Sequence, residues 1–269
     1  MKRLIYAVLL SSFTLFGSAK ANAALTYNDL WWIPTESGWG FNIAQQGDAL
    51  FITFFVYGQD SKPTWFTGQL TKTGQSANGQ PVYSGHTYVT SGPWFGAAAF
   101  NSSSVTIREA GSITFAPSDA TTAVLTYSVD GVNVTKTVQR QTLVNENLTG
   151  SYSSLWRFTV ACPGIGTTSQ QVNYNISITH SSGQFQYTRA NPANPADSCT
   201  ATGTWTQQGA LGHANGNLTC TDGSTGTFAL AEVSTNATGF TSHYSASLKG
   251  PLTANQTCTV DGTLTGLRL

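Results

Sequence analysis

The fold is decided by residues 31–57, which read WWIPTESGWGFNIAQQGDALFITFFVY. Within this stretch, residues 38–46 and 49–57 form two arms rich in apolar residues, and Gly47-Asp48 lies between them. Such a pair between two apolar arms is typical of a tight turn, because glycine adopts the positive φ that hairpin turns require. The stretch therefore predicts the opening β-hairpin of a β-rich domain.

The chain starts with the three parts of a secretory signal peptide. Lys2 and Arg3 supply the basic start, an apolar run covers residues 4–16, and Ala21-Asn22-Ala23 offers small residues for cleavage. We expect residues 1–23 to be removed and the protein to be exported, either periplasmic or secreted. The apolar run is shorter than the roughly 20 residues of a membrane-spanning helix. This disfavours a retained anchor, and we expect no transmembrane segment after cleavage.

Charged residues make up only 9% of the chain, against roughly 25% in ordinary soluble domains. Lys2, Arg3 and Lys20 leave with the signal peptide, so nine of the 12 basic residues remain against 12 acidic ones, a net charge of about −3. Since binding to nucleic acid or to anionic lipid depends on basic surfaces, we expect neither partner. The candidate partners are a glycan or a small molecule.

Segments in which apolar and polar residues alternate, separated by turns, run through the whole chain, and no helical period is evident. Each half holds roughly eight such segments, spaced as in an up-and-down barrel or a sandwich. In the first half, Ser104–Glu109 and Ser112–Phe115 are expected as two short strands. In the second half, Ala190–Ser198 is expected as the longest irregular piece. We predict an all-β protein with two β-meander barrel or sandwich domains, an aromatic-rich domain at 24–147 and a disulfide-stapled domain at 148–269.

Large apolar side chains on these strands are expected to fill one core in each domain, each buried aromatic contributing on the order of 2–3 kcal/mol. The first core is predicted to contain Phe51, Phe54, Phe55, Tyr57, Trp65 and Phe66. The second is predicted to contain Phe158, Val160, Ile176, Ile178, Trp205, Phe228, Leu230, Phe240 and Leu248. The halves are alike in length and in number of strands, which suggests a duplicated architecture, although no residue-level repeat is evident.

All four cysteines, Cys162, Cys199, Cys220 and Cys258, lie in the second half. An even number in an exported chain predicts disulfides, and three pairings are open. We favour Cys162–Cys199 and Cys220–Cys258, because sequential pairs close loops between neighbouring strands. A metal site is not expected, since no C-x-x-C pair occurs and the four histidines are scattered.

Glu36 is the sharpest candidate for a functional residue, because carboxylates are scarce and this one lies among tryptophans and glycines. It could bind a polar ligand, or act as a general acid with a raised pKa. A structural alternative is that it accepts backbone N–H groups at the Ser37-Gly38 turn. The predicted ligand-binding residues are Trp32, Glu36, Trp39 and Trp65.

The first half also holds five of the seven tryptophans, which could form a stacking platform or simply close one end of the domain. They are Trp31, Trp32, Trp39, Trp65 and Trp94. His86 could be a general base, but an exposed histidine at a strand end is the plainer interpretation. The chain has no nucleophile elbow, P-loop or dinucleotide fingerprint. We therefore predict no catalytic residue, no cofactor and no bound metal.

Residues 31–42 follow the pattern WWxPxESGWGxN, and Gln46-Gly47-Asp48 and Pro63-x-Trp65 come after it. With Leu125-Thr126-Tyr127 and Arg140-Gln141 further on, this chain resembles a widespread group of uncharacterised exported bacterial proteins over residues 30–142. The resemblance implies bacterial export and a β-rich module. The group offers no catalytic residues to carry over, so the resemblance does not name an activity.

The sequence thus favours an exported, non-catalytic binding or interaction module with an aromatic cleft. Two other classes are open. One is a hydrolase acting on polysaccharide or cell wall, with Glu36 as the acid. The other is a structural component of the cell surface.

Overall fold

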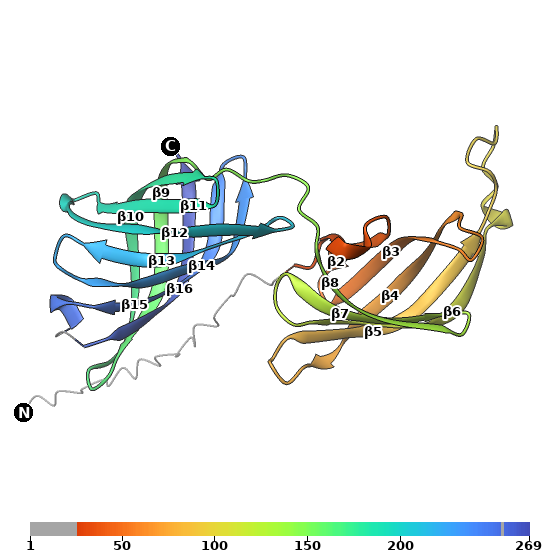
Figure 1. Ribbon diagram of the computed structural model, residues 1–269, viewed down its shortest axis with the longest axis horizontal. Helices are drawn as coiled ribbons and strands as arrows, with labels where there is room; N and C mark the ends of the chain where they lie inside the picture. The colour runs from red at the N-terminus through yellow and green to blue at the C-terminus, as the bar shows by residue number, and fades with distance from the viewer. Residues whose placement is uncertain (1–25, 254–255) are drawn as a thin grey trace, which may run out of the picture.

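The structure is a computed structural model that describes residues 26–253 and 256–269. It consists almost entirely of β-strands, which form two closed antiparallel barrels of eight strands each (Figure 1). The predicted all-β fold with two meander barrels is therefore confirmed. The predicted signal peptide lies outside the described residues. Within 26–253 and 256–269, no helix has the length and apolar character needed to cross a bilayer.

In the first barrel each strand pairs with the next, and β1 closes the ring against β8. Two short 3-10 helices, η1 and η2, lie in its loops. The elements are β1 (Asp29–Trp32), η1 (Pro34–Glu36), β2 (Gly40–Gln46), β3 (Ala49–Tyr57), β4 (Pro63–Gln75), β5 (Pro81–Ser91), η2 (Ser102–Ser104), β6 (Thr106–Pro117), β7 (Thr122–Val129) and β8 (Val132–Arg140).

The second barrel repeats this plan, with β9 closing the ring against β16. Its elements are β9 (Gly150–Cys162), β10 (Gly166–Ser181), β11 (Gln184–Asn191), β12 (Asn194–Gln208), β13 (Leu211–Cys220), β14 (Thr225–Asn236), β15 (Gly239–Lys249), η3 (Pro251–Thr253) and β16 (Cys258–Arg268).

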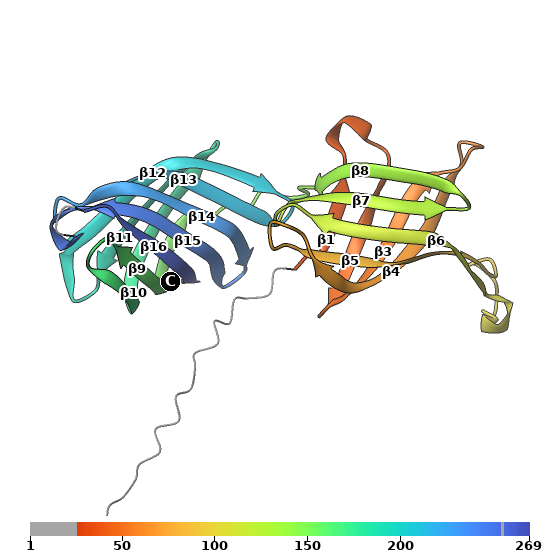
Figure 2. The same cartoon turned by 90° about the horizontal axis from the view of Figure 1, so that it is seen from below.

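Two of the predicted segment boundaries are wrong. The short strands expected at Ser104–Glu109 and Ser112–Phe115 are one strand, β6, because Gly111 stays in the ladder opposite Thr87. The irregular piece expected at Ala190–Ser198 is the end of β11, a tight turn and the start of β12. The longest segment between strands is instead residues 92–105, which projects from the first barrel away from the second (Figures 1 and 2).

Both barrels close with the same contact between their first and last strands. In the first barrel, buried Trp31 lies opposite Arg140, whose guanidinium carbon is 5.2 Å from the indole ring centroid. In the second, buried Tyr152 lies opposite Arg268, whose guanidinium carbon is 5.4 Å from the phenol ring centroid. A cation over an aromatic face is a favourable contact, more so when it is shielded from water. This is a residue-level correspondence between the two halves that is not evident in the sequence.

The core of the second barrel contains all the residues predicted for it, either buried or packed against buried ones. In the first barrel, only Phe54 and Phe66 of the predicted set are buried. The other four, Phe51, Phe55, Tyr57 and Trp65, are exposed. The reason is the two-residue period of a strand: Leu50, Ile52, Phe54 and Val56 point inward, so the residues between them face outward.

The favoured disulfide pairing, Cys162–Cys199 and Cys220–Cys258, is wrong. The bonds join Cys162 to Cys258 and Cys199 to Cys220. Barrel closure explains the first bond, since β9 and β16 are neighbours although they are the first and last strands. The second bond joins residues directly opposite each other on β12 and β13. Both lie at the end of the second barrel that is remote from the first.

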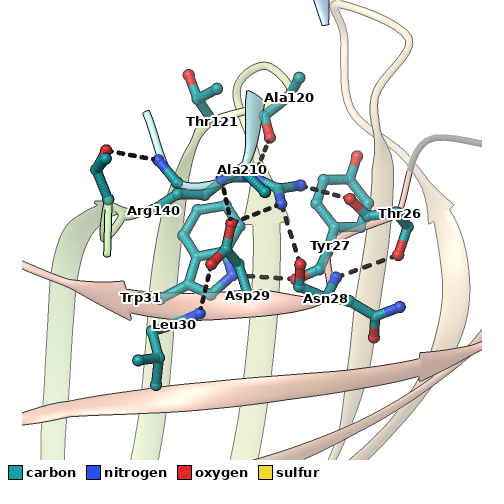
Figure 3. A network of polar contacts seen from close by, with 12 residues as sticks. Thr26, Tyr27, Asn28, Asp29, Leu30, Trp31, Ala120, Thr121, Arg140 and Ala210 are labelled. Carbon is teal, nitrogen blue, oxygen red and sulfur yellow. Dashed lines mark hydrogen bonds and ion pairs between the residues drawn. The ribbon is translucent and has the colours of Figure 1, made fainter. Parts of the chain in front are cut away.

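The turn between β12 and β13 lies against the end of the first barrel where β8 finishes (Figures 2 and 3). The Ala210 backbone N–H donates to Asp29 Oδ2 at 3.1 Å, and Asp29 pairs with buried Arg140 at 3.2 Å. Gly209, with φ of 60°, has no room for a side chain, because a Cβ there would collide with Asp29 and Arg140. We call this contact the joint.

The segment between the barrels is held by Gln207 of β12. Its side-chain nitrogen donates to the carbonyl of Val144 at 2.8 Å, and its side-chain oxygen accepts from the backbone N–H of Glu146 at 2.9 Å. The Gly209 N–H donates to Thr142 Oγ1 at 3.0 Å. These hydrogen bonds attach residues 141–149 to the same turn that makes the joint.

Candidate functional site

Glu36 lies at the end of η1 and makes two side-chain contacts through Oε2. It accepts a hydrogen bond from Trp39 Nε1 at 2.9 Å and pairs with Lys136 Nζ at 2.6 Å. Lys136 lies 5.3 Å from the centre of the Trp39 ring. On β8, Lys136 is two residues before buried Val138, so both side chains lie on the same face of the strand and Lys136 points into the barrel. The three residues form a cluster at the mouth of the lumen.

The electrostatics of this cluster oppose an acid role for Glu36. The hydrogen bonds from Lys136 and Trp39 stabilise the ionised carboxylate and lower the pKa of Glu36 below its usual value. A general acid working near neutral pH needs the opposite shift. The contacts also differ from the structural alternative foreseen for Glu36, since both donors are side chains and not the backbone of the Ser37-Gly38 turn.

Of the four predicted ligand-binding residues, Glu36 and Trp39 are in contact with each other. Trp32 and Trp65 lie on the outer face of the barrel, on β1 and β4. Trp31 is fully buried in the core, and Trp94 lies in the 92–105 segment beside Phe95. The five tryptophans therefore do not form one platform.

The outer face carries a row of aromatic side chains that crosses the strands. Phe55 on β3 lies opposite Trp65 on β4 and opposite Gly40 on β2. The Phe55 ring lies over Gly40, because a Cβ at Gly40 would be 3.0 Å from Phe55 Cε2. The Tyr57 ring lies beside Gly38 in the same way, because a Cβ added at Gly38 would be 3.9 Å from Tyr57 Cε2. Both glycines of the Ser37–Gly40 stretch thus leave space for an aromatic ring.

These rings are open to solvent to a degree unusual for large apolar side chains. The exposed fraction is 45% for Phe55, 54% for Trp65 and 59% for Tyr57. An exposed apolar patch of this kind in a soluble domain often marks a binding surface. We call Phe55, Tyr57 and Trp65 the aromatic row.

On the same outer face as the aromatic row, nearer the start of β3, the surface of β2–β5 is hollowed into a depression of about 640 Å³. Phe51 and Tyr88 contribute rings to it, and Gln69 and His86 contribute polar groups. His86 Nδ1 lies 2.9 Å from Glu109 Oε1, so the imidazole is oriented by a carboxylate, but both side chains are more than half exposed. The pair fixes a hydrogen-bonding group at the edge of the depression.

Of this surface, sequence reasoning identified only Trp65 as a candidate for ligand binding, because it assigned Phe51, Phe55 and Tyr57 to the core by their size. Strict alternation along β3, counted from Leu50, would have placed them outside. Gln69 and His86 gave no such indication, since their position beside Phe51 follows only from the register of β3, β4 and β5.

In the described part of the chain, no group of three or more His, Cys, Asp or Glu side chains is arranged to hold a metal ion. No protein-family model, curated protein or solved structure matches this chain. The outer face of the first barrel is therefore interpreted from its own geometry.

Proposed function

We propose that this protein is an exported, non-catalytic binding module, and that the outer face of its first barrel binds a glycan. The observation that carries the proposal is the exposed aromatic row on the same outer face as the depression on β2–β5. Export is supported by the predicted signal peptide, by the two disulfides and by the resemblance to exported bacterial proteins.

The chemistry of the face favours a neutral, hydroxyl-rich ligand. Aromatic rings pack against the C–H faces of sugars, and amide, imidazole and hydroxyl groups bond to sugar hydroxyls. Gln69, Ser84 and His86 line the depression together with the Phe51 ring, and the lining contains no Asp, Glu, Lys or Arg. A charged ligand would find no opposite charge among the lining side chains.

A hydrolase with Glu36 as its acid is less well supported. That carboxylate is held ionised by Lys136, and it belongs to the lumen mouth, whereas the aromatic row lies on the outer face. A purely structural role would leave the exposed aromatic row without a function.

The test is affinity electrophoresis of the mature protein in gels containing soluble cell-wall or plant polysaccharides. We expect at least one polysaccharide to retard the wild type, and Trp65→Ala to weaken that interaction by about tenfold or more, as for a central aromatic contact. Phe95→Ala is the matched control, because Phe95 is 94% exposed but lies in the 92–105 segment.

Three outcomes would contradict the proposal. In the first, no polysaccharide retards the wild type. In the second, Trp65→Ala and Phe95→Ala migrate alike. In the third, the wild type releases reducing sugar and Glu36→Gln abolishes this release, which would support the hydrolase.

A further inference from the structure

The lumen of the second barrel contains a cavity of about 380 Å³ at the end that carries the two disulfides. Its walls are inward-facing side chains of strands from both sides of the barrel seam. They include Trp156, Phe158, Val160, Tyr174, Leu248 and Val260. The volume lies within the range of small-molecule sites, and barrel mouths are frequent places for them.

The cavity exists because the two halves of the lumen are filled differently. Nearer the joint, large rings pack on one another, with Phe185 stacked on Trp205 at 5.8 Å and Tyr152 edge-on to Phe240 at 5.0 Å between centroids. Towards the disulfides, the inward positions of β9 and β16 carry smaller residues, Val160, Cys162 and Cys258. An eight-stranded barrel is wide enough either to be filled by side chains or to hold one small ligand.

Arg189 of β11 brings a cation into this apolar space. Its guanidinium carbon lies 4.4 Å from the centre of the Tyr174 ring. Its Nη1 atom is buried and has no hydrogen-bond partner among residues 26–253 and 256–269. A buried guanidinium N–H without an acceptor is unfavourable, so Nη1 is free to donate to an anion.

The surroundings of Arg189 offer polar groups but no negative charge. Arg189 is the only charged residue among the described residues that line the cavity. The Tyr187 hydroxyl is buried, and the Tyr244 hydroxyl lies near it. Burial raises the pKa of both phenols, so both stay neutral and able to donate to an anion.

We propose that the second barrel binds an amphipathic carboxylate, whose acid group pairs with Arg189 and whose apolar body lies between Trp156, Phe158, Val160 and Leu248. The ligand class follows from the single cation in a cavity whose other lining residues are uncharged and mostly apolar. This site does not depend on the aromatic row of the first barrel.

The test is isothermal titration calorimetry of the full mature chain with dodecanoate and, separately, with dodecanol at concentrations below micelle formation. We expect saturable binding of one dodecanoate, with dodecanol at least tenfold weaker, because a hydrogen bond to a charged group is lost. Arg189→Gln should bring dodecanoate down to the affinity of dodecanol and leave dodecanol unchanged. A merely structural role for Arg189 would weaken both ligands.

Three further variants distinguish the loss of the contact with the ligand's acid group from a loss of folding. Arg157→Gln is the matched control and should bind as the wild type does, because Arg157 faces outward and bonds Gln171. Arg189→Lys keeps the positive charge and should still bind dodecanoate more tightly than dodecanol. It serves as the test variant if Arg189→Gln does not fold. Val160→Phe should fill the cavity and reduce binding of both ligands. The proposal is overturned if the wild type does not bind dodecanoate saturably, if it binds dodecanol equally well, or if folded Arg189→Gln binds dodecanoate as tightly.

Discussion

Glu36 holds Trp39 and Lys136 at the mouth of the first barrel, and it does so as a carboxylate. Lys136 is 100 residues away in the chain and reaches Glu36 only because β8 closes the barrel beside β1. The scarcity of charge was enough to single out Glu36 in the sequence. Its partner could not be predicted there, because no local pattern says which later strand will stand next to η1.

The lowered pKa of Glu36 predicts a pH-dependent contribution to stability. A carboxylate whose pKa is depressed by folding stabilises the folded state at pH values above its unfolded pKa, here 4.5, and loses this effect as the pH falls through the folded pKa. Glu36→Gln should therefore lower the thermal unfolding midpoint slightly at pH 7. The difference from the wild type should close below pH 4.5.

Thermal scans of both proteins between pH 3 and pH 8 would measure this difference. Asp48→Asn is a suitable control, because Asp48 makes no ion pair in the part of the chain that the structure describes. A constant difference between Glu36→Gln and the wild type across this pH range would show that the ionised carboxylate is not what stabilises the cluster.

At the scale of elements, most strands could be predicted because turns separate them clearly. Gly47-Asp48 and Asp130-Gly131 both form hairpin turns, and Gly47, Asp130 and Gly131 have positive φ. The inward and outward faces were harder to predict, since bulky side chains were taken as buried. Phe55 and Trp65 show that the alternation of side chains along the strand, and not the size of the ring, decides whether a residue points inward or outward.

The disulfide pairing was mispredicted for a topological reason. A meander suggests that near neighbours in sequence are neighbours in space, and Cys199–Cys220 follows that rule. Cys162–Cys258 does not, because ring closure makes β9 and β16 adjacent across a separation of 96 residues. Nothing in the spacing of four cysteines distinguishes an open meander from a closed one.

The two disulfides should contribute differently to the stability of the second barrel. In the chain-entropy account a bond that closes a loop of about 100 residues stabilises by about 4.7 kcal/mol, and one that closes about 15 residues by about 3 kcal/mol. The separations here are 96 and 21 residues. Replacing Cys162 and Cys258 by alanine should therefore cost more than replacing Cys199 and Cys220.

Hydrogen exchange of the amides of β9–β16 during urea unfolding would report on the second barrel alone. The first barrel, which has no disulfide in its described residues, serves as the internal reference. Equal losses in the two double variants would contradict the loop-length account.

At the scale of the whole molecule, the joint depends on a glycine that has both a left-handed backbone and no free space. Gly209→Ala should separate the turn from Asp29 and Arg140, because its Cβ would overlap both side chains. We expect a larger radius of gyration by X-ray scattering and faster proteolysis within residues 141–149. The core of each barrel should keep its hydrogen-exchange protection.

Gly47→Ala is the matched control for this change. Gly47 has a similar φ of 57°, but a Cβ there would meet no atom within 4 Å. Gly47→Ala should lower the free energy of unfolding by on the order of 1 kcal/mol, because alanine is strained in a left-handed backbone conformation. The shape of the protein should not change. If both variants scatter alike, the joint does not depend on Gly209.

The joint also determines which ends of the two barrels are open to other molecules. Because the β12–β13 turn lies against the end of the first barrel where β8 finishes, the disulfide-bearing end of the second barrel points away from the first, and the 92–105 segment extends from the opposite side of the first barrel (Figure 2). The molecule thus has two ends that face away from each other, one on each barrel. While the joint holds, a ligand at one end lies on the opposite side of the molecule from a partner at the other.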